Sequence, residues 1–147
     1  RLKHNARLNW AMETATGKHP VWANDATGLL ESPIATLGCF FVENNKLALR
    51  LPLKNTVLPS ITRRQWLLAA KAAGINVQQT PLFVKQVDDG DGGMLLGNSL
   101  RGSFWLKTIN NRILHVGSIQ AHPQFAQWTA ALTCITGMDY SDLLTRR

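Results

Sequence analysis

Residues 57–66 read Val57-Leu58-Pro59-Ser60-Ile61-Thr62-Arg63-Arg64-Gln65-Trp66, a loop that turns into a helix. Pro59 fixes the chain just ahead of the helix, and Ser60 is a good N-cap because its hydroxyl can accept a backbone N–H that has no partner inside the helix. Gly74 is in the usual position to end the helix. Helical spacing predicts one stripe made of Ile61, Gln65, Leu68 and Ala72.

The first turn of this predicted helix has the features of an anion site. Free N–H groups and the positive end of the helix dipole are expected to meet the Thr62 hydroxyl there. The side chains of Arg63 and Arg64 are expected to converge on the same spot. Many helices begin with Ser or Thr and bind nothing, so this stretch outlines a phosphate site and the rest of the chain has to support it.

Length and composition indicate one globular domain. The chain has 147 residues, of which 45% are hydrophobic and 17% are charged, and a chain of this size can bury a proper core. It contains no apolar run long enough to span a bilayer, and its N-terminus lacks the apolar segment of a signal peptide. We therefore expect a cytoplasmic protein that has no membrane partner.

Basic residues are unevenly placed along the chain. The net charge is +7, and residues 44–87 contain no acid but seven bases, namely Lys46, Arg50, Lys54, Arg63, Arg64, Lys71 and Lys85. Such a block could attract nucleic acid or a polyanionic small molecule. The bases form no tight run, however, and no nucleic-acid motif accompanies them. A scattered, solvated surface and no nucleic-acid partner are predicted.

Cysteines and histidines predict neither a disulfide nor a metal site. Cys39 and Cys134 are far apart and belong to no CxxC pair, which suggests buried thiols in a reducing compartment. The four histidines lack metal-ligand spacing, and the acidic loop at 88–93 lacks the distal Glu of an EF-hand. We expect no metal.

Turn signals and apolar spacing together predict an α+β domain. Its strands come mostly as hairpins, so the sheet should be mixed or antiparallel and not doubly wound. The expected elements are a helix at 2–16, a hairpin at 21–32, a hairpin at 36–51, a helix at 60–73, strands at 75–79 and 94–96, a hairpin at 103–116 around Asn110-Asn111, a helix at 124–135 and a short helix at 139–144.

Four short motifs occur in an order that resembles a known family. They are LKHNARL at 2–8, GLLES at 28–32, VLPSITR at 57–63 and GNSLRG at 97–102. Taken singly, each is typical of an ordinary surface or strand end. Together they resemble the large C-terminal domain of the class IV (fold type IV) pyridoxal-phosphate aminotransferases, and within that family the 4-amino-4-deoxychorismate lyases most. The resemblance covers essentially the whole chain.

The resemblance implies a fold and a set of site residues. It implies that residues 1–147 form a single domain whose sheet is a pseudo-barrel, and that the family's smaller N-terminal domain is absent. Lys3 matches the lysine that is bound covalently to pyridoxal 5'-phosphate and moves the substrate Cα proton. Glu31 matches the carboxylate that faces the pyridine nitrogen. Ile61 and Thr62 match the helix-start residues that hold the cofactor phosphate, and Ser99 matches a second phosphate contact.

The resemblance also implies an activity. A lyase of this kind eliminates pyruvate from 4-amino-4-deoxychorismate and leaves 4-aminobenzoate, a folate precursor. The alternatives are a branched-chain or D-amino-acid transaminase of the same family, or a catalytically incomplete domain that keeps the fold. A small-molecule substrate and a homodimer are expected in the first two cases. Ser60 stands where the family usually has Gly, and Thr36 where it usually has Asn.

Overall fold

The computed structural model describes residues 21, 23–24, 28–29, 35–57, 59–83, 92–109 and 112–145. The helix predicted at 2–16 lies outside these residues. So do the predicted site residues Lys3 and Glu31, which therefore remain predictions.

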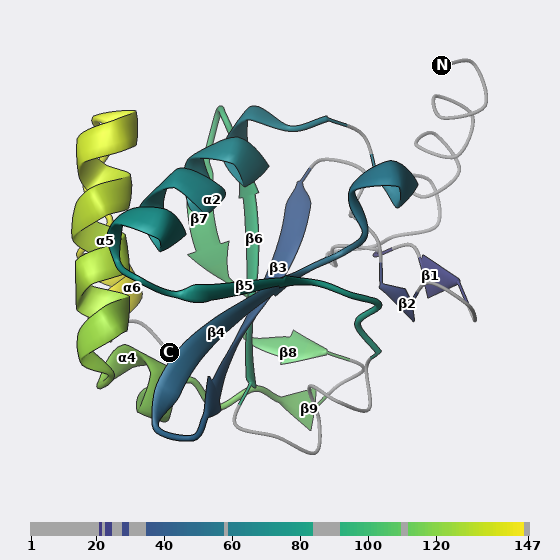
Figure 1. Ribbon diagram of the computed structural model, residues 1–147, viewed down its shortest axis with the longest axis horizontal. Coiled ribbons are helices and arrows are strands. Elements are labelled where there is room, and N and C mark those ends of the chain that lie inside the picture. Colours follow the sequence, from purple (N-terminus) through teal and green to yellow (C-terminus); the bar gives the residue numbers. More distant parts are fainter. Residues whose placement is uncertain are drawn as a thin grey trace.

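Strands and helices come mostly in separate runs along the described chain (Figure 1). The strands are β1 (Ala23–Asn24), β2 (Gly28–Leu29), β3 (Thr36–Glu43), β4 (Lys46–Leu51), β5 (Asn76–Gln79), β6 (Gly92–Asn98), β7 (Gly102–Trp105), β8 (Thr108–Ile109) and β9 (Arg112–Ile113). The helices are the 3-10 turn η1 (Lys54–Thr56), α2 (Ile61–Ala72), α4 (Gly117–Gln120), α5 (Pro123–Thr136) and α6 (Asp142–Thr145). This is the expected α+β architecture.

Five of the strands form one mixed sheet in the order β5-β4-β3-β6-β7. Strand β5 runs parallel to β4, and the other neighbours are antiparallel, so the predicted mixed sheet is confirmed. The pseudo-barrel that the family resemblance implied is not seen among the described strands. There β5 and β7 remain as open edges, because β8 pairs with β9, and β2 pairs with β1 and, through a single bridge at Gly28, with Leu82.

The hairpin between β3 and β4 was predicted correctly. Its turn, Glu43-Asn44-Asn45-Lys46, has two central residues with positive φ, 52° at Asn44 and 63° at Asn45. Two-residue hairpin loops of this kind match the twist of the strands, and Asn tolerates the left-handed conformation better than most residues.

The hairpin predicted at 103–116 is wrong in its pairing. Only Thr108–Ile109 pairs with Arg112–Ile113, whereas Gly102–Trp105 pairs with β6. A three-residue loop joins β6 to β7, and Gly102 closes it with a φ of 75°. A Cβ atom at this position would lie 2.8 Å from the Tyr140 hydroxyl. The short loop that Gly102 closes therefore pairs β7 with β6 and not with the segment that follows β7.

Two apolar layers cover the two faces of the sheet. On one face α2 and α5 pack side by side over Phe40, and the buried rings of Phe40 and Trp128 meet edge to face at 4.8 Å. The other face carries a second cluster that extends to β2 and to the segment after β9. Its fully buried members include Leu37, Met94 and Leu96.

The stripe predicted on the 60–73 helix faces solvent, which corrects the sequence analysis. Ile61 is 65% exposed and Leu68 is 50% exposed, whereas Trp66, Ala69 and Ala70 are fully buried. The limits of the helix were predicted almost correctly, since α2 begins after Ser60 and ends before Gly74. Burying the large indole of Trp66 set the rotation of the helix, because it removes more apolar surface from water than burying Ile61 would.

The two cysteines differ in burial, although both were expected to be buried. Cys39 is a buried free thiol, as predicted, and burial raises its pKa well above the usual range. Cys134 is also a free thiol but is exposed, so its predicted burial is wrong. Within the described part of the chain, no helix has the length and apolarity needed to cross a membrane.

Candidate functional site

The first turn of α2 leaves backbone donors open. The Ser60 hydroxyl accepts the N–H of Arg63 at 3.1 Å, and the Ser60 carbonyl accepts the N–H of Arg64 at 3.2 Å. Among the described residues, no acceptor faces the N–H groups of Ile61 and Thr62. The start of α2 therefore offers two N–H donors at the positive end of the helix dipole.

Thr62 adds a hydroxyl to this turn. The residue as a whole is only 4% exposed, and its hydroxyl lies in the same first turn as the open backbone N–H groups. Ile61, by contrast, points its side chain to solvent and can contribute only its backbone N–H.

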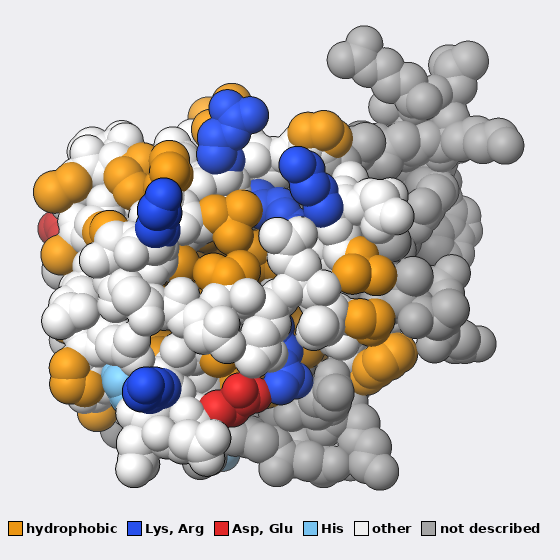
Figure 2. Space-filling view, viewed as in Figure 1, with side chains coloured by type: hydrophobic (Ala, Val, Ile, Leu, Met, Phe, Trp, Pro, Cys, Tyr) orange, Lys and Arg blue, Asp and Glu red, His pale blue; other side chains and the backbone are white. Residues whose placement is uncertain are grey.

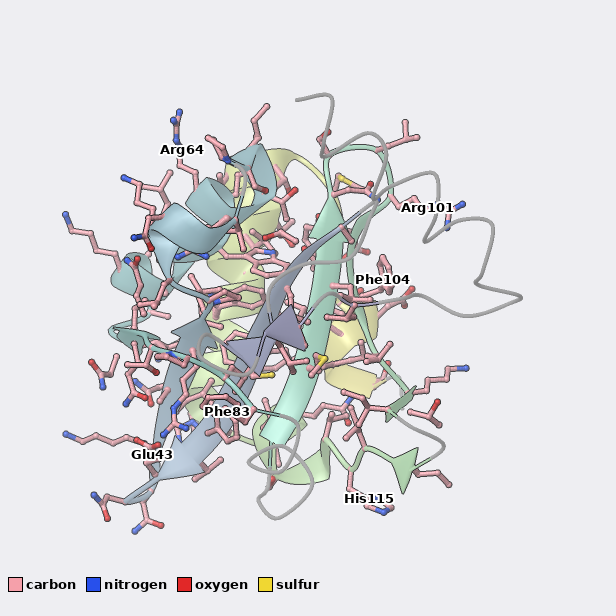
Figure 3. All side chains as sticks on the ribbon, turned by 90° about the vertical axis from the view of Figure 1, so that its right-hand side faces the viewer. Glu43, Arg64, Phe83, Arg101, Phe104 and His115 are labelled. Carbon is pink, nitrogen blue, oxygen red and sulfur yellow. The ribbon has the colours of Figure 1, made fainter. Side chains whose placement is uncertain are left out.

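The two arginines do not converge on this turn, which is a second correction. Arg63 is buried, and its Nη2 donates to the Pro52 carbonyl at 2.7 Å and to Gln79 Oε1 at 3.2 Å. Its Nη1 has no partner among the described residues, and burial lowers the pKa of the guanidinium. Arg64 points away from the body of the molecule (Figure 3). Arg63 thus ties the loop before α2 to the end of β5.

The turn after β6 lies beside the start of α2. Gly97, near the end of β6, packs so closely against α2 that a Cβ atom placed on it would lie 2.9 Å from Thr62 Cγ2. Asn98 closes the turn, because its Oδ1 accepts the N–H groups of Leu100 at 3.0 Å and Arg101 at 2.7 Å. Ser99 is exposed at the tip of this turn.

Three predicted site residues thus belong to two neighbouring elements. Ile61 and Thr62 begin α2, and Ser99 follows Gly97 by two residues in the adjoining turn. The sequence analysis did not identify Trp66, Gly97 and Ser103, which connect the two elements. The indole Nε1 of Trp66 donates to the Ser103 hydroxyl at 2.7 Å. Trp66 was visible in the opening stretch, but nothing in the sequence marked Ser103 as its partner.

Basic side chains do not form a continuous patch on the face that carries α2 and β5. Figure 2 shows Lys and Arg side chains standing apart there, with apolar and uncharged groups between them. The guanidinium of Arg50, on β4, is paired with Glu43 at 2.6 Å and lies 4.7 Å from the centre of the Phe41 ring. This agrees with the scattered basic surface expected from the sequence.

A groove of about 510 Å³ runs along β7 and α6. Its charged lining is mixed, with Arg101 and Lys107 on the strand side and Asp139 and Asp142 on the helix side. A hydrogen bond from the Ser141 N–H lowers the pKa of Asp139. The groove adjoins the β6–β7 turn through Arg101, but its lining does not include the start of α2.

Comparison with known proteins gives a family match over most of the chain. The family model described as Amino-transferase class IV matches residues 2–107. A crystal structure of a candidate 4-amino-4-deoxychorismate lyase from Legionella pneumophila superposes with a TM-score of 0.65 at 25% identity. The matched region covers 90% of this chain and 46% of the Legionella chain. No curated protein gave a match in the sequence comparison.

More distant structures share the fold. The branched-chain aminotransferase from Thermoproteus uzoniensis, solved with norvaline, has a TM-score of 0.70 at 16% identity. The matched region covers 95% of this chain and 45% of the Thermoproteus chain. The pyridoxal-phosphate-bound form of a hypothetical aminotransferase from Mycobacterium tuberculosis has a TM-score of 0.68 at 22% identity, covering 90% and 45% of the two chains. The present chain therefore spans about half the length of the structures it matches.

Proposed function

The chain belongs to the amino-transferase class IV family, whose enzymes depend on pyridoxal phosphate, and on that premise we propose that it is the cofactor-binding domain of a 4-amino-4-deoxychorismate lyase. Residues 1–147 would form the large C-terminal domain, without the family's smaller N-terminal domain. The observation that carries the proposal is the pair of open N–H donors of Ile61 and Thr62 beside the β6–β7 turn. A phosphate group fits such a set of donors.

The residues around the start of α2 fit the cofactor phosphate chemically. The N–H groups of Ile61 and Thr62 and the Thr62 hydroxyl can each donate to a phosphate oxygen. Ser99 can donate a further hydroxyl from the adjoining turn. The helix dipole of α2 adds a favourable interaction with the negative charge. No arginine is needed from this turn, since Arg63 is already engaged with Pro52 and Gln79.

Lys3 and Glu31 are proposed for the chemical steps. Bound pyridoxal phosphate supplies an electron sink for the electrons left when a substrate proton is removed. Lys3 must be neutral to bond to the cofactor, and as a free amine it can then carry the substrate Cα proton. Glu31 would keep a proton on the pyridine nitrogen, because an adjacent carboxylate favours the charged ring.

The lyase reaction is supported by the likeness to the Legionella protein. In that reaction the bond between the ring carbon and the enolpyruvyl oxygen breaks and one ring proton is lost, so that the products are 4-aminobenzoate and pyruvate. A branched-chain transaminase is the second candidate, favoured by the fold likeness to the Thermoproteus enzyme. We further propose a cytoplasmic homodimer; the two free thiols are in keeping with a reducing compartment.

The cofactor role is tested by absorbance spectroscopy. The chain mixed with pyridoxal phosphate should gain the visible absorbance of lysine-bound cofactor, and borohydride followed by peptide mapping should place the label on Lys3. Lys3→Ala should abolish this absorbance, whereas Lys71→Ala, which removes an exposed lysine of α2, should keep it. An unchanged spectrum in Lys3→Ala would exclude Lys3 from the role.

The reaction is tested by product analysis. Incubation with 4-amino-4-deoxychorismate should yield pyruvate and 4-aminobenzoate in equal amounts. Transfer of the amino group from a branched-chain or D-amino acid to a 2-oxo acid, without release of 4-aminobenzoate, would instead favour the transaminase. Cofactor binding without either reaction would mean that the chain holds the cofactor but is catalytically incomplete.

A further inference from the structure

We infer that Trp66, Gly97 and Ser103 are positioning residues that hold the β6–β7 turn against the start of α2 and so set the geometry of the phosphate site. The inference rests on the proposed function, since it concerns how that site is assembled. None of the three residues needs to touch the phosphate. Their role follows from the separation of the two halves of the site, which lie at residues 61–62 and at residue 99 and meet only through tertiary contacts.

Trp66 lies on the same face of α2 as Thr62, one helical turn later. Its indole is fully buried and rests on glycines of two neighbouring strands. A Cβ atom on Gly97 would lie 2.8 Å from the ring, and one on Gly38 would lie 3.0 Å from it. Thr62 and Trp66 therefore contact β6 together, and the absence of a side chain at Gly97 sets how closely α2 approaches the turn.

A buried hydrogen bond fixes where the β6–β7 hairpin lies along α2. Trp66 Nε1 donates to Ser103 Oγ at 2.7 Å, and Ser103 is the residue paired with Gly97 across β6 and β7. The bond thus joins α2 to the base of the hairpin whose tip carries Ser99. Sliding the hairpin along α2 would leave the indole N–H buried without an acceptor, which is costly.

Helix α5 supports this arrangement from the other side. Trp128 Nε1 donates to the Trp66 carbonyl at 3.2 Å, and α2 and α5 pack together along their lengths. The start of α2 is thus held both by the helix layer and by the hairpin. A phosphate group that contacts both Thr62 and Ser99 would experience any shift at this junction directly.

The test compares the affinity of the chain for pyridoxal phosphate with its affinity for pyridoxal, which lacks the phosphate. Absorbance titrations give both dissociation constants. The dissociation constant for pyridoxal divided by that for pyridoxal phosphate reports the contribution of the phosphate alone, and a smaller ratio means a weaker phosphate contribution. In Ser103→Ala and in Gly97→Ala, we expect this ratio to fall about tenfold, the change expected when about one hydrogen bond to a charged group is lost. Affinity for pyridoxal should stay within about twofold in both variants, since a twofold change is under 0.5 kcal/mol.

Matched controls separate positioning from general damage. Gly117→Ala adds the same methyl group where no atom lies within 4 Å, so it should keep the ratio. Trp66→Phe should lower the ratio, whereas Trp105→Phe, which removes the indole bond to the Leu143 carbonyl at 2.8 Å, should not. In the double variant Trp66→Phe/Ser103→Ala the ratio should fall no further than in either single variant, because the two residues share one bond.

The outcomes distinguish this inference from the proposed function. If the unmodified chain binds neither compound, the proposed function and the inference both fail. If the chain binds pyridoxal phosphate and the Ser103 and Gly97 variants lower the melting temperature while keeping the ratio, the three residues are merely structural and only the inference fails. Ser103→Ala removes a single oxygen, so the test does not depend on the folding of Trp66→Phe.

Discussion

At the scale of single residues, Ser60 stabilises the start of α2 through its hydroxyl. Ser60→Ala should lower the free energy of unfolding by about 1 kcal/mol, and Ser60→Gly by only a few tenths. Urea unfolding of the two variants measures the difference. A loss near zero in Ser60→Ala would mean that the bond to the Arg63 N–H is not a source of stability. Ser60→Gly should also free that N–H for the phosphate, so cofactor affinity should not fall.

Arg63 and Arg64 are adjacent but should behave differently when replaced. Arg63→Met leaves the buried Pro52 carbonyl without its donor, so the free energy of unfolding should fall by about 1–3 kcal/mol. Arg64→Met changes an exposed side chain, and the effect should stay within about 0.5 kcal/mol. Chemical denaturation of both variants compares them. Similar losses in the two variants would contradict the separate placement of the two guanidinium groups.

The two thiols should differ sharply in reactivity. Cys39 is buried and has a raised pKa, so at pH 8 it should react with a disulfide reagent only when the chain unfolds. Cys134 is exposed and should react in the folded state. The folded chain should therefore consume one equivalent of reagent, and Cys134→Ser should consume none. Two fast equivalents would show that the core around Cys39 opens readily.

At the scale of the elements, the β3–β4 turn depends on the left-handed conformation of Asn45. Asn45→Gly should keep or raise stability, because glycine adopts positive φ freely. Asn45→Ala should lower the free energy of unfolding by about 1 kcal/mol, since the added strain of a left-handed residue is of that order. Thermal unfolding of the two variants tests this. Equal stability would mean that the turn relaxes to another form in Asn45→Ala.

The ends of α2 could be predicted from the sequence, but its buried face could not. Ser60 and Gly74 are local signals, which act through a backbone N–H or a positive φ and need no partner elsewhere. The buried face depends on what the sheet offers. Gly38 and Gly97 leave room for the Trp66 ring, and this tertiary fit turned Ile61 and Leu68 toward solvent. Propensity and periodicity contain no information about that fit.

The pairing of β7 was missed for a similar reason. The short run Ser103 to Trp105 suits any neighbouring strand, and Asn110-Asn111 offered a turn signal on its other side. The closure of the β6–β7 loop by Gly102, and the hydrogen bonds from Leu100 and Arg101 to Asn98, decided the choice. The β3–β4 hairpin was predicted correctly because both of its strands flank a strong two-residue turn signal.

At the scale of the whole molecule, the predicted site is brought together only in part. Ile61, Thr62 and Ser99 lie on neighbouring elements, and their role as phosphate contacts stays a prediction. Lys3 and Glu31 stay predictions that rest on the family resemblance. What the sequence could not provide is the junction of Trp66, Gly97 and Ser103, because it joins residues 37 positions apart through a contact that exists only in the folded chain.

The most direct test of the proposed phosphate site is an amide chemical-shift titration of the isotope-labelled chain with pyridoxal phosphate, with pyridoxal as the reference compound. The site described above predicts that the N–H signals of Ile61, Thr62 and Ser99 move with pyridoxal phosphate and remain nearly unchanged with pyridoxal. Shifts confined to other parts of the chain, or equal shifts with both compounds, would contradict the assignment of the α2 start and the β6–β7 turn as the phosphate site.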